Sequence, residues 1–323
     1  MKIWSCVGVL LLLIGLSIFI GSQPLTAGEV WQSLTGGGPA TNDAVVWGLR
    51  IPRTLIAVVC GCALGLAGAL TQEHTRNVLA DPGLLGVTAG ASGGVVVAIM
   101  LFGFTTASEY VWCALIGALI AAILVLGISA KVTAFVPATT VILTGAIVSA
   151  LLGSLTSMAV LIDKNVSEVF RFWSVGSLAS RNFDVLLHIL PLLLIGLTLW
   201  AINLPAIGPL SLGDINAQSL GRNVRKDHFI GFAAIACLTA AATAACGSIA
   251  FLGLLAPHLA RALTGPHRAQ TAILSGICGA ALMLAADITG RIVLPHSEVP
   301  VGIMLALIGA PTFIMIARKK VNE

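Results

Sequence analysis

The sequence predicts an all-α membrane protein of about ten transmembrane helices with both termini in the cytoplasm. Its composition and the spacing of its charges carry this prediction. Of its 323 residues, 58% are hydrophobic and 9% are charged, and the mean hydropathy is +1.03. Soluble domains carry about 25% charged residues, and a single core cannot hide this much apolar surface from water. Lipid is therefore the solvent, which excludes soluble enzymes and nucleic-acid-binding proteins.

Charge-free stretches mark the spans, because a helix needs about 20 apolar residues to cross the hydrocarbon layer. Nine stretches qualify, at residues 3–21, 54–72, 82–108, 110–130, 132–162, 185–213, 228–260, 269–286 and 299–317. The first is longer than the roughly 7–15-residue apolar region of a signal peptide, so we expect a retained helix there.

The stretch 228–260 is too long for one span. Its 33 residues would form a helix of about 50 Å at 1.5 Å per residue. Gly247 is a candidate break, and Pro257 disturbs the second piece. Two shortened helices fit better and bring the count to ten, with nine spans as the alternative.

The placement of the cations gives the orientation. An even number of spans puts both termini on one side, and a cytoplasmic placement gives eleven Lys and Arg inside against six outside. This excess follows the positive-inside rule. The inside cations are Lys2, Arg76, Lys131, Arg222, Arg225, Lys226, Arg261, Arg268, Arg318, Lys319 and Lys320. The outside cations are Arg50, Arg53, Lys164, Arg171, Arg181 and Arg291.

Small residues recur at four-residue spacing in two spans. One stripe contains Gly61, Gly65 and Ala69. Such stripes let helix backbones approach closely where lipid provides no hydrophobic drive, so we interpret them as packing surfaces. A second stripe contains Gly145, Ser149 and Gly153 and is extended by the polar residue Thr156. For this stripe, lining a transport pathway is the alternative interpretation.

Energy-coupling motifs are missing from the sequence. No lysine follows a glycine, so there is no phosphate-binding G-x-x-x-x-G-K-[ST] loop. Asp287 is the best candidate for an ion-coupling group, but it lies four residues before Arg291 and is explained more simply as a helical ion pair. We therefore expect any ATP to be bound by another subunit and disfavour an ion-coupled secondary transporter.

No metal site or enzyme active site is expected. The seven cysteines all fall in predicted spans, and Cys60 and Cys62 lie about 200° apart around a helix. Buried cysteines of this kind behave as small hydrophobes. The six histidines show no H-E-x-x-H spacing. An intramembrane enzyme would need a second acidic group or a metal set near Asp287.

The segment Arg50-Ile51-Pro52-Arg53 precedes the second span on the outside. Proline suits the first helical turn, and the two arginines, three residues apart, share a face. Arg291 ends the ninth span on the same side. Membrane anchoring is one interpretation, but the outside location favours a docking patch for an acidic protein partner.

The longest cytoplasmic loop, residues 204–227, contains a short predicted helix at 215–220 between an N-cap at Asp214 and a stop at Gly221. A helix this short is stable only when docked, either on the chain's own cytoplasmic face or in a groove of a partner. Its exposed apolar residues are predicted to be Leu212, Ile215, Ala217 and Leu220.

Taken in order, the motifs resemble the FecCD family, the permease subunits of ABC importers for iron–siderophores, haem and cobalamin. The matching pieces are Arg50-Ile51-Pro52-Arg53-Thr54-Leu55, Thr75-Arg76-Asn77, Leu79-Ala80-Asp81-Pro82-Gly83-Leu84-Leu85-Gly86-Val87, Phe172-Trp173, Gly176-Ser177-Leu178, Leu212-Gly213, Leu220-Gly221, Gly247-Ser248-Ile249-Ala250-Phe251-Leu252-Gly253-Leu254, Pro257-His258 with Arg261, Ala286-Asp287 with Arg291, Glu298-Val299-Pro300-Val301-Gly302 and Leu307-Ile308-Gly309-Ala310-Pro311. Two positions depart from the family pattern, since Val78 and Ser248 stand where the family usually has proline.

The resemblance implies a type II ABC importer permease, with one transmembrane domain over residues 1–323. It implies a second permease subunit (identical or homologous), two ATP-binding subunits, a periplasmic substrate-binding protein and the inner membrane. The carried-over docking residues are Arg50, Arg53 and Arg291. The ATPase-coupling residues are Leu212, Gly213, Asp214, Ile215, Ala217, Leu220 and Gly221. The pathway-lining residues are Gly145, Ser149, Gly153 and Thr156.

The resemblance also implies the activity: import of a ferric siderophore without chemistry in this chain. ATP and Mg²⁺ would be used on the partner ATPase, and this chain would bind no cofactor or metal. Cobalamin or haem is the alternative cargo.

Overall fold

The computed structural model describes residues 2–21, 23, 25–132, 138–179, 181–265, 267–294 and 297–321, and these residues form helices and connecting segments without a β-strand. The long helices are α1 (Lys2–Phe19), α4 (Ile51–Thr75), α5 (Val87–Phe102), α6 (Ala107–Val132), α7 (Ala138–Ile162), α9 (Phe183–Asn203), α12 (Val224–Cys246), α13 (Leu252–Thr264), α14 (Arg268–Ile292) and α15 (Val301–Val321). The short elements are α2 (Ala27–Leu34), α3 (Ala40–Val45), η1 (Val46–Arg50), η2 (Pro82–Leu85), α8 (Lys164–Val175), η3 (Leu204–Ala206), α10 (Ile207–Ser211) and α11 (Asp214–Ser219).

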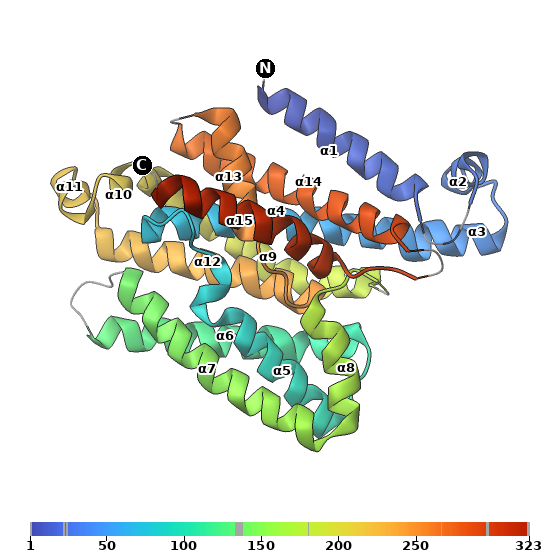
Figure 1. The fold of residues 1–323 in the computed structure, drawn as a ribbon, viewed down its shortest axis with the longest axis horizontal. Helices are drawn as coiled ribbons and strands as arrows, with labels where there is room; N and C mark the ends of the chain where they lie inside the picture. The colour runs from blue at the N-terminus through green and yellow to red at the C-terminus, as the bar shows by residue number, and fades with distance from the viewer. Residues whose placement is uncertain are drawn as a thin grey trace.

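Most long helices run along the long axis of the molecule (Figure 1). α10 and α11 lie at one end, and α2 and α3 at the other. α4 and α12 are central and largely buried, with α14 against α4 and α6 against α12. α7 is the least buried of the long spans. The most buried helices, α4 and α12, are thus surrounded by other helices. The apolar outer faces of the remaining helices are available to lipid or to partner proteins.

The ten predicted spans correspond to the ten long helices. Six helical segments of the described chain are long and apolar enough to cross a membrane, and α1, α5 and α15 contain shorter apolar stretches. The predicted break in 228–260 is confirmed, because α12 ends at Cys246 and α13 begins at Leu252. The predicted span 132–162 corresponds to α7, which begins at Ala138. Its first residue, Val132, ends α6, and residues 133–137 lie outside the described part.

Three glycines make the break between α12 and α13 possible. Gly247 has φ +81°, and a Cβ there would overlap the carbonyl oxygen of Trp173. A Cβ at Gly176, after α8, would overlap the carbonyl oxygen of Ser248. A Cβ at Gly302, in the first turn of α15, would overlap the carbonyl oxygen of Val175. The ends of α8, α12 and α15 therefore cross at one glycine junction, where side chains would not fit.

The first small-residue stripe is a packing surface, as predicted, and its partner helix is α14. A Cβ at Gly65 would overlap the Ser275 carbonyl oxygen, and one at Gly279 would overlap that of Gly61. One helical turn further along α4, Gly68 lies equally close to the backbone of Gly253 in α13. Close backbone approach is the means by which helices gain packing energy in lipid.

A capped turn at residues 81–83 leads into α5. Asp81 caps η2, and its Oδ1 accepts a hydrogen bond from the Gly83 N–H at 2.8 Å. Burial raises the pKa of the Asp81 carboxyl, and the hydrogen bond from Gly83 opposes that rise. A Cβ at Gly253 would lie 2.5 Å from Cδ of Pro82, so this turn also needs the small residue of α13.

Replacing Gly68 with Ala is expected to lower the free energy of unfolding by about 1–3 kcal/mol, because the new methyl group would overlap the Gly253 backbone. The matched control is Gly93→Ala in α5, where a Cβ meets nothing within 4 Å and helix propensity favours alanine. Thermal unfolding of the purified protein in detergent measures both variants. Equal melting temperatures for the two would contradict the proposed close packing.

Candidate functional sites

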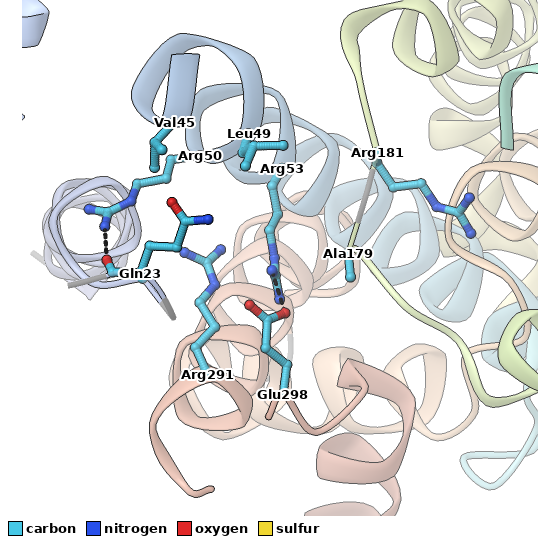
Figure 2. A pocket seen from close by; sticks show the side chains of 10 residues that line it. Gln23, Val45, Leu49, Arg50, Arg53, Ala179, Arg181, Arg291 and Glu298 are labelled. Carbon is cyan, nitrogen blue, oxygen red and sulfur yellow. Dashed lines mark hydrogen bonds and ion pairs between the residues drawn. The ribbon is translucent and has the colours of Figure 1, made fainter. Parts of the chain in front are cut away.

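A pocket of about 260 Å³ lies at the α3 end of the molecule, where the ends of α1 and α14 meet the start of α4 (Figure 2). The structure brings the three predicted docking arginines together there. The pocket is lined by Gly21, Gln23, Val45, Leu49, Arg50, Arg53, Ala179, Arg181, Arg291 and Glu298. Four arginines and a single glutamate thus line the pocket, which gives it an excess of positive charge.

Arg50 is buried and holds the end of α1. It closes the π-helical turn η1, from which α4 continues with Pro52 in its first turn, as predicted. Its Nη1 donates to the carbonyl oxygens of Ile18 at 2.8 Å and Phe19 at 2.9 Å, and its Nη2 donates to that of Gln23 at 2.7 Å. The last carbonyls of a helix have no partner within the helix, so this guanidinium serves as their cap.

Arg291, at the end of α14, binds the same end of α1. Its Nη1 donates to the carbonyl oxygens of Ser17 at 2.8 Å and Ile20 at 2.9 Å. Its Nη2 forms an ion pair with Asp287, one helical turn earlier, which confirms the pair predicted from the spacing. Arg50 and Arg291 therefore direct most of their donors inward, to the chain itself.

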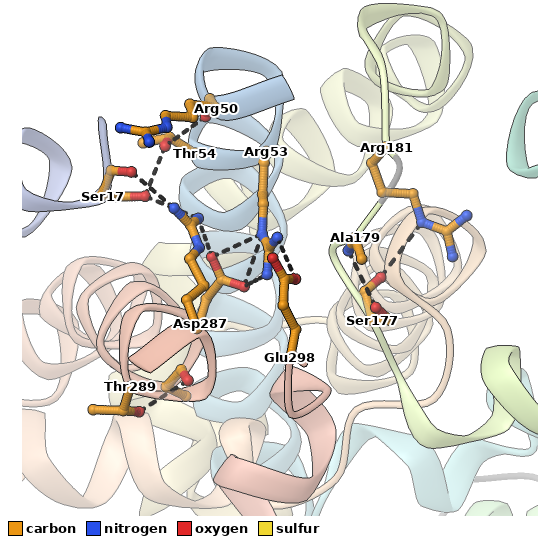
Figure 3. A network of polar contacts seen from close by, with 12 residues as sticks. Ser17, Arg50, Arg53, Thr54, Ser177, Ala179, Arg181, Asp287, Thr289 and Glu298 are labelled. Atoms are coloured by element: carbon orange, nitrogen blue, oxygen red, sulfur yellow. Dashed lines mark hydrogen bonds and ion pairs between the residues drawn. The ribbon is translucent and has the colours of Figure 1, made fainter. Parts of the chain in front are cut away.

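Arg53 forms the centre of the pocket network (Figure 3). Its Nη2 and Nε donate to Oδ1 of Asp287 at 2.7 and 3.1 Å, and its Nη1 donates to Oε2 of Glu298 at 2.7 Å. The Asp287 carboxylate is only 1% exposed and lies between the guanidinium groups of Arg53 and Arg291. Arg53 is 14% exposed, and Glu298 is 23% exposed, so this pair is the part of the network that solvent reaches.

Arg181 was not predicted to join the patch. Its Nη1 donates to the Tyr110 hydroxyl at 2.9 Å, and its guanidinium carbon lies 5.9 Å from the centre of that ring. It lines the pocket on the side opposite Arg50, and its guanidinium group points away from Arg53 (Figure 2). It follows an irregular segment after α8, and no sequence period indicates where such a segment runs.

At the opposite end, α11 occupies the predicted short-helix position, one residue earlier than expected. Gly221, with φ +80°, ends it as predicted. The N-cap prediction was wrong, because Gly213 is the cap and Asp214 is the first helical residue. The Asp214 carboxylate instead forms an ion pair with Arg76 at the end of α4. Its Oδ1 also lies 3.3 Å from Nε2 of His228.

The apolar surface of the α11 region also differs from the prediction at one residue. Leu212, Ile215 and Leu220 are exposed, and Ile215 is the most exposed at 81%. Ala217 is fully buried and was wrongly placed on this surface. Two positions along a helix turn the side chain by about 200°, so Ala217 faces away from Ile215. It packs in a small cluster with Ala206, Leu210 and Val224.

Residues 9–319 match the FecCD transport family. The chain belongs to this family. It is 41% identical to the ferric enterobactin transport system permease protein of Escherichia coli strain K12, over 97% of this chain and 94% of that protein. It is 32% identical to the vitamin B12 import system permease protein of Vibrio cholerae serotype O1, over 94% and 91% of the two chains.

The fold agrees with this assignment. A solved metal-chelate type ABC transporter in an inward-facing conformation is similar to the chain, with a TM-score of 0.85 and 28% identity over 98% of both chains. This FecCD protein is therefore a multi-pass membrane permease, as the sequence motifs predicted. Within the described residues, no group of three or more His, Cys, Asp or Glu is arranged to hold a metal ion.

Three of the four predicted pathway residues of this FecCD permease lie on the side of α7 that faces η2 and α5. A Cβ at Gly145 would overlap the Leu84 carbonyl oxygen, and Thr156 Oγ1 lies 3.5 Å from Ser92 Oγ. Ser149 Oγ lies 3.5 Å from a Cβ built on Gly86, whereas Gly153 has open space around it. Their role in a pathway stays a prediction.

Proposed function

We propose that this FecCD permease imports a ferric siderophore across the inner membrane as one subunit of an ABC transporter. The supporting observation is the 41% identity, over nearly the whole chain, to a ferric enterobactin permease. Cobalamin is the second candidate cargo because of the 32% identity to a vitamin B12 permease. Haem is the third candidate, supported only by the family resemblance. The chain makes and breaks no bond in this proposal.

ATP hydrolysis is assigned to two partner subunits, since the sequence has no phosphate-binding lysine loop. The exposed side chains of Leu212, Ile215 and Leu220 would enter a groove of the ATPase. Asp214 joins this surface to the ends of α4 and α12. Movement of the ATPase would therefore be passed to two central helices, whose tilting would open the pathway to alternate sides. ATP and Mg²⁺ act only on the partner.

The arginine pocket is assigned to docking of the substrate-binding protein. A carboxylate of that protein would approach Arg53, whose guanidinium lies at the solvent-reached part of the network. Arg50 and Arg291 would act at a distance through their charge, because most of their donors are already bound to α1, the segment after it and Asp287. A second permease subunit, identical or homologous, would complete the pathway beside the exposed apolar face of α7.

Uptake of a labelled ferric catecholate siderophore by a deletion strain that carries this gene tests the cargo. Unlabelled ferric siderophore is expected to suppress the uptake, and excess cobalamin or haem is expected to leave it unchanged. Suppression by cobalamin or haem instead would assign the cargo to that competitor.

Ile215→Asp is expected to reduce uptake by about tenfold or more, because it places a charge in the apolar contact with the ATPase. Gln218→Asp is the matched control, since it adds the same charge to the same helix at an exposed polar position. Membrane levels of both variants are compared by immunoblot. If the two variants transport equally well, α11 is not the coupling surface.

Arg53→Gln is expected to weaken binding of the substrate-binding protein by about tenfold or more and to reduce the salt dependence of that binding. Arg171→Gln is the control, because Arg171 is exposed on the same side but lies outside the pocket. Titration of the binding protein against the permease in nanodiscs measures both. Unchanged affinity in Arg53→Gln, with an unchanged melting temperature, would exclude docking at this pocket.

A further inference from the structure

Two buried histidines meet at the α11 end of the molecule, between α4 and α12. Nδ1 of His74 lies 2.9 Å from Nδ1 of His228, and Nε2 of His74 lies 2.8 Å from Oδ1 of Asn203 at the end of α9. Gly231 makes room for the pair, because a Cβ there would overlap the His74 ring. Every ring nitrogen of the pair therefore has a polar partner, once the contact of His228 with Asp214 is included.

The orientation of Asn203 is determined by its second hydrogen bond. Its Nδ2 donates to the carbonyl oxygen of Asp227 at 2.7 Å, a group that can only accept. Oδ1 of Asn203 therefore faces His74, and it too can only accept. Nε2 of His74 must carry a hydrogen.

The other end of the pair meets a carboxylate. Nε2 of His228 lies 3.3 Å from Oδ1 of Asp214, which also forms an ion pair with Arg76. An ionised carboxylate has no hydrogen to donate. Nε2 of His228 must therefore carry a hydrogen as well.

The contact between the two Nδ1 atoms needs a third hydrogen, since one of them must donate to the other. Two neutral imidazoles carry only two ring N–H groups between them. If the pair were neutral, one of its three contacts would bring two acceptors together at hydrogen-bond distance. The donor and acceptor count thus requires one additional proton.

We infer that the His74–His228 pair carries one positive charge in this conformation, and that this charge fastens Asp214, at the start of α11, to the ends of α4 and α12. Both histidines then act as positioning residues for the coupling helix, which rests on the proposed role of α11. The charge belongs to the pair as a unit, because the rings share the central proton.

The charged groups around the pair explain why the proton is held near α11. Burial disfavours a charged ring, and Arg76 repels it. The Asp214 carboxylate favours the charge and lies on the His228 side. Asp227, on α12, has its carboxylate paired with Arg222 at 2.8 Å, whereas the Asp214 carboxylate, although it also pairs with Arg76, is in contact with a ring nitrogen of the pair. When the pair loses its proton, either the ring-to-ring contact or the contact with Asp214 becomes unfavourable.

As a consequence, the connection of α11 to α4 and α12 depends on cytoplasmic pH. The bridge from α11 to α4 and α12 is complete while the pair holds its proton, and it is lost as the pH rises above the range in which the pair titrates. A permease whose coupling helix is held less firmly would pass on less of the ATPase movement.

Nitrogen-15 NMR of the full chain in nanodiscs, labelled at histidine, tests the charge directly. At about pH 5.5 the wild type is expected to show an imidazolium signal that disappears in His228→Gln and persists in His267→Gln, which changes an exposed histidine of the same end. Asp214→Asn keeps both rings and is expected to abolish the signal as well. Neutral rings only, at about pH 5.5, would overturn the inference.

The effect on coupling is measured in proteoliposomes that contain the complete transporter with its binding protein. Between about pH 5 and pH 8 the number of ATP molecules hydrolysed per substrate transported is expected to rise about tenfold in the wild type and in His267→Gln. His228→Gln, which can still donate to Asp214, is expected to show a ratio that does not change with pH across this range. A ratio in His228→Gln that rises as in the wild type would overturn the positioning role.

The two measurements separate this inference from the proposed function. The NMR experiment needs neither the ATPase nor the cargo, so it reports the charge whatever the chain transports. If Ile215→Asp left uptake intact while the imidazolium signal was present, the coupling assignment of α11 would fail and the charged pair would stand.

Discussion

One buried carboxylate fixes the outer end of this permease. Asp287 is almost inaccessible to water and lies between the guanidinium groups of Arg53 and Arg291. A lone buried charge would cost several kcal/mol, so each member of this trio requires the others. Arg291 also donates to the carbonyl oxygen of Ser17 in α1, and Arg53 donates to Glu298 before α15. The ends of α1, α4 and α14 and the segment before α15 are thereby tied to a single point.

The Asp287 network brings α4 and α14 together, and this allows small residues further along the two helices to pack. Once the outer ends are joined, α4 and α14 run side by side, and Gly61, Gly65 and Gly279 let their backbones touch. In lipid, apolar side chains gain little by leaving the solvent, so such contacts have to supply much of the association energy. The charged end determines which helices meet, and the glycines determine how closely they meet.

Local features of the fold could be read from the sequence. Charge spacing located the spans, the break at Gly247 followed from helix length, and the α4 stripe followed from four-residue spacing. Long-range partners could not be read in this way. The carbonyls capped by Arg50 and the position of Arg181 depend on segments far away in the chain, and no period encodes them. Asp214 was predicted as a cap from local rules, but Arg76 and His228 compete for its carboxylate. The docking, coupling and pathway roles stay predictions.

The glycine junction of Gly176, Gly247 and Gly302 has a mechanical consequence. The carbonyl of Gly176 accepts a hydrogen bond from the Gly302 N–H at 3.1 Å, and the Ser177 N–H donates to Cys246 at 2.8 Å. Backbone that leaves a helix inside lipid must find such partners, because water is not available. Three segments distant in the chain therefore share one set of hydrogen bonds and cannot slide past one another independently. During transport, the ends of α8, α12 and α15 would therefore move as one rigid unit.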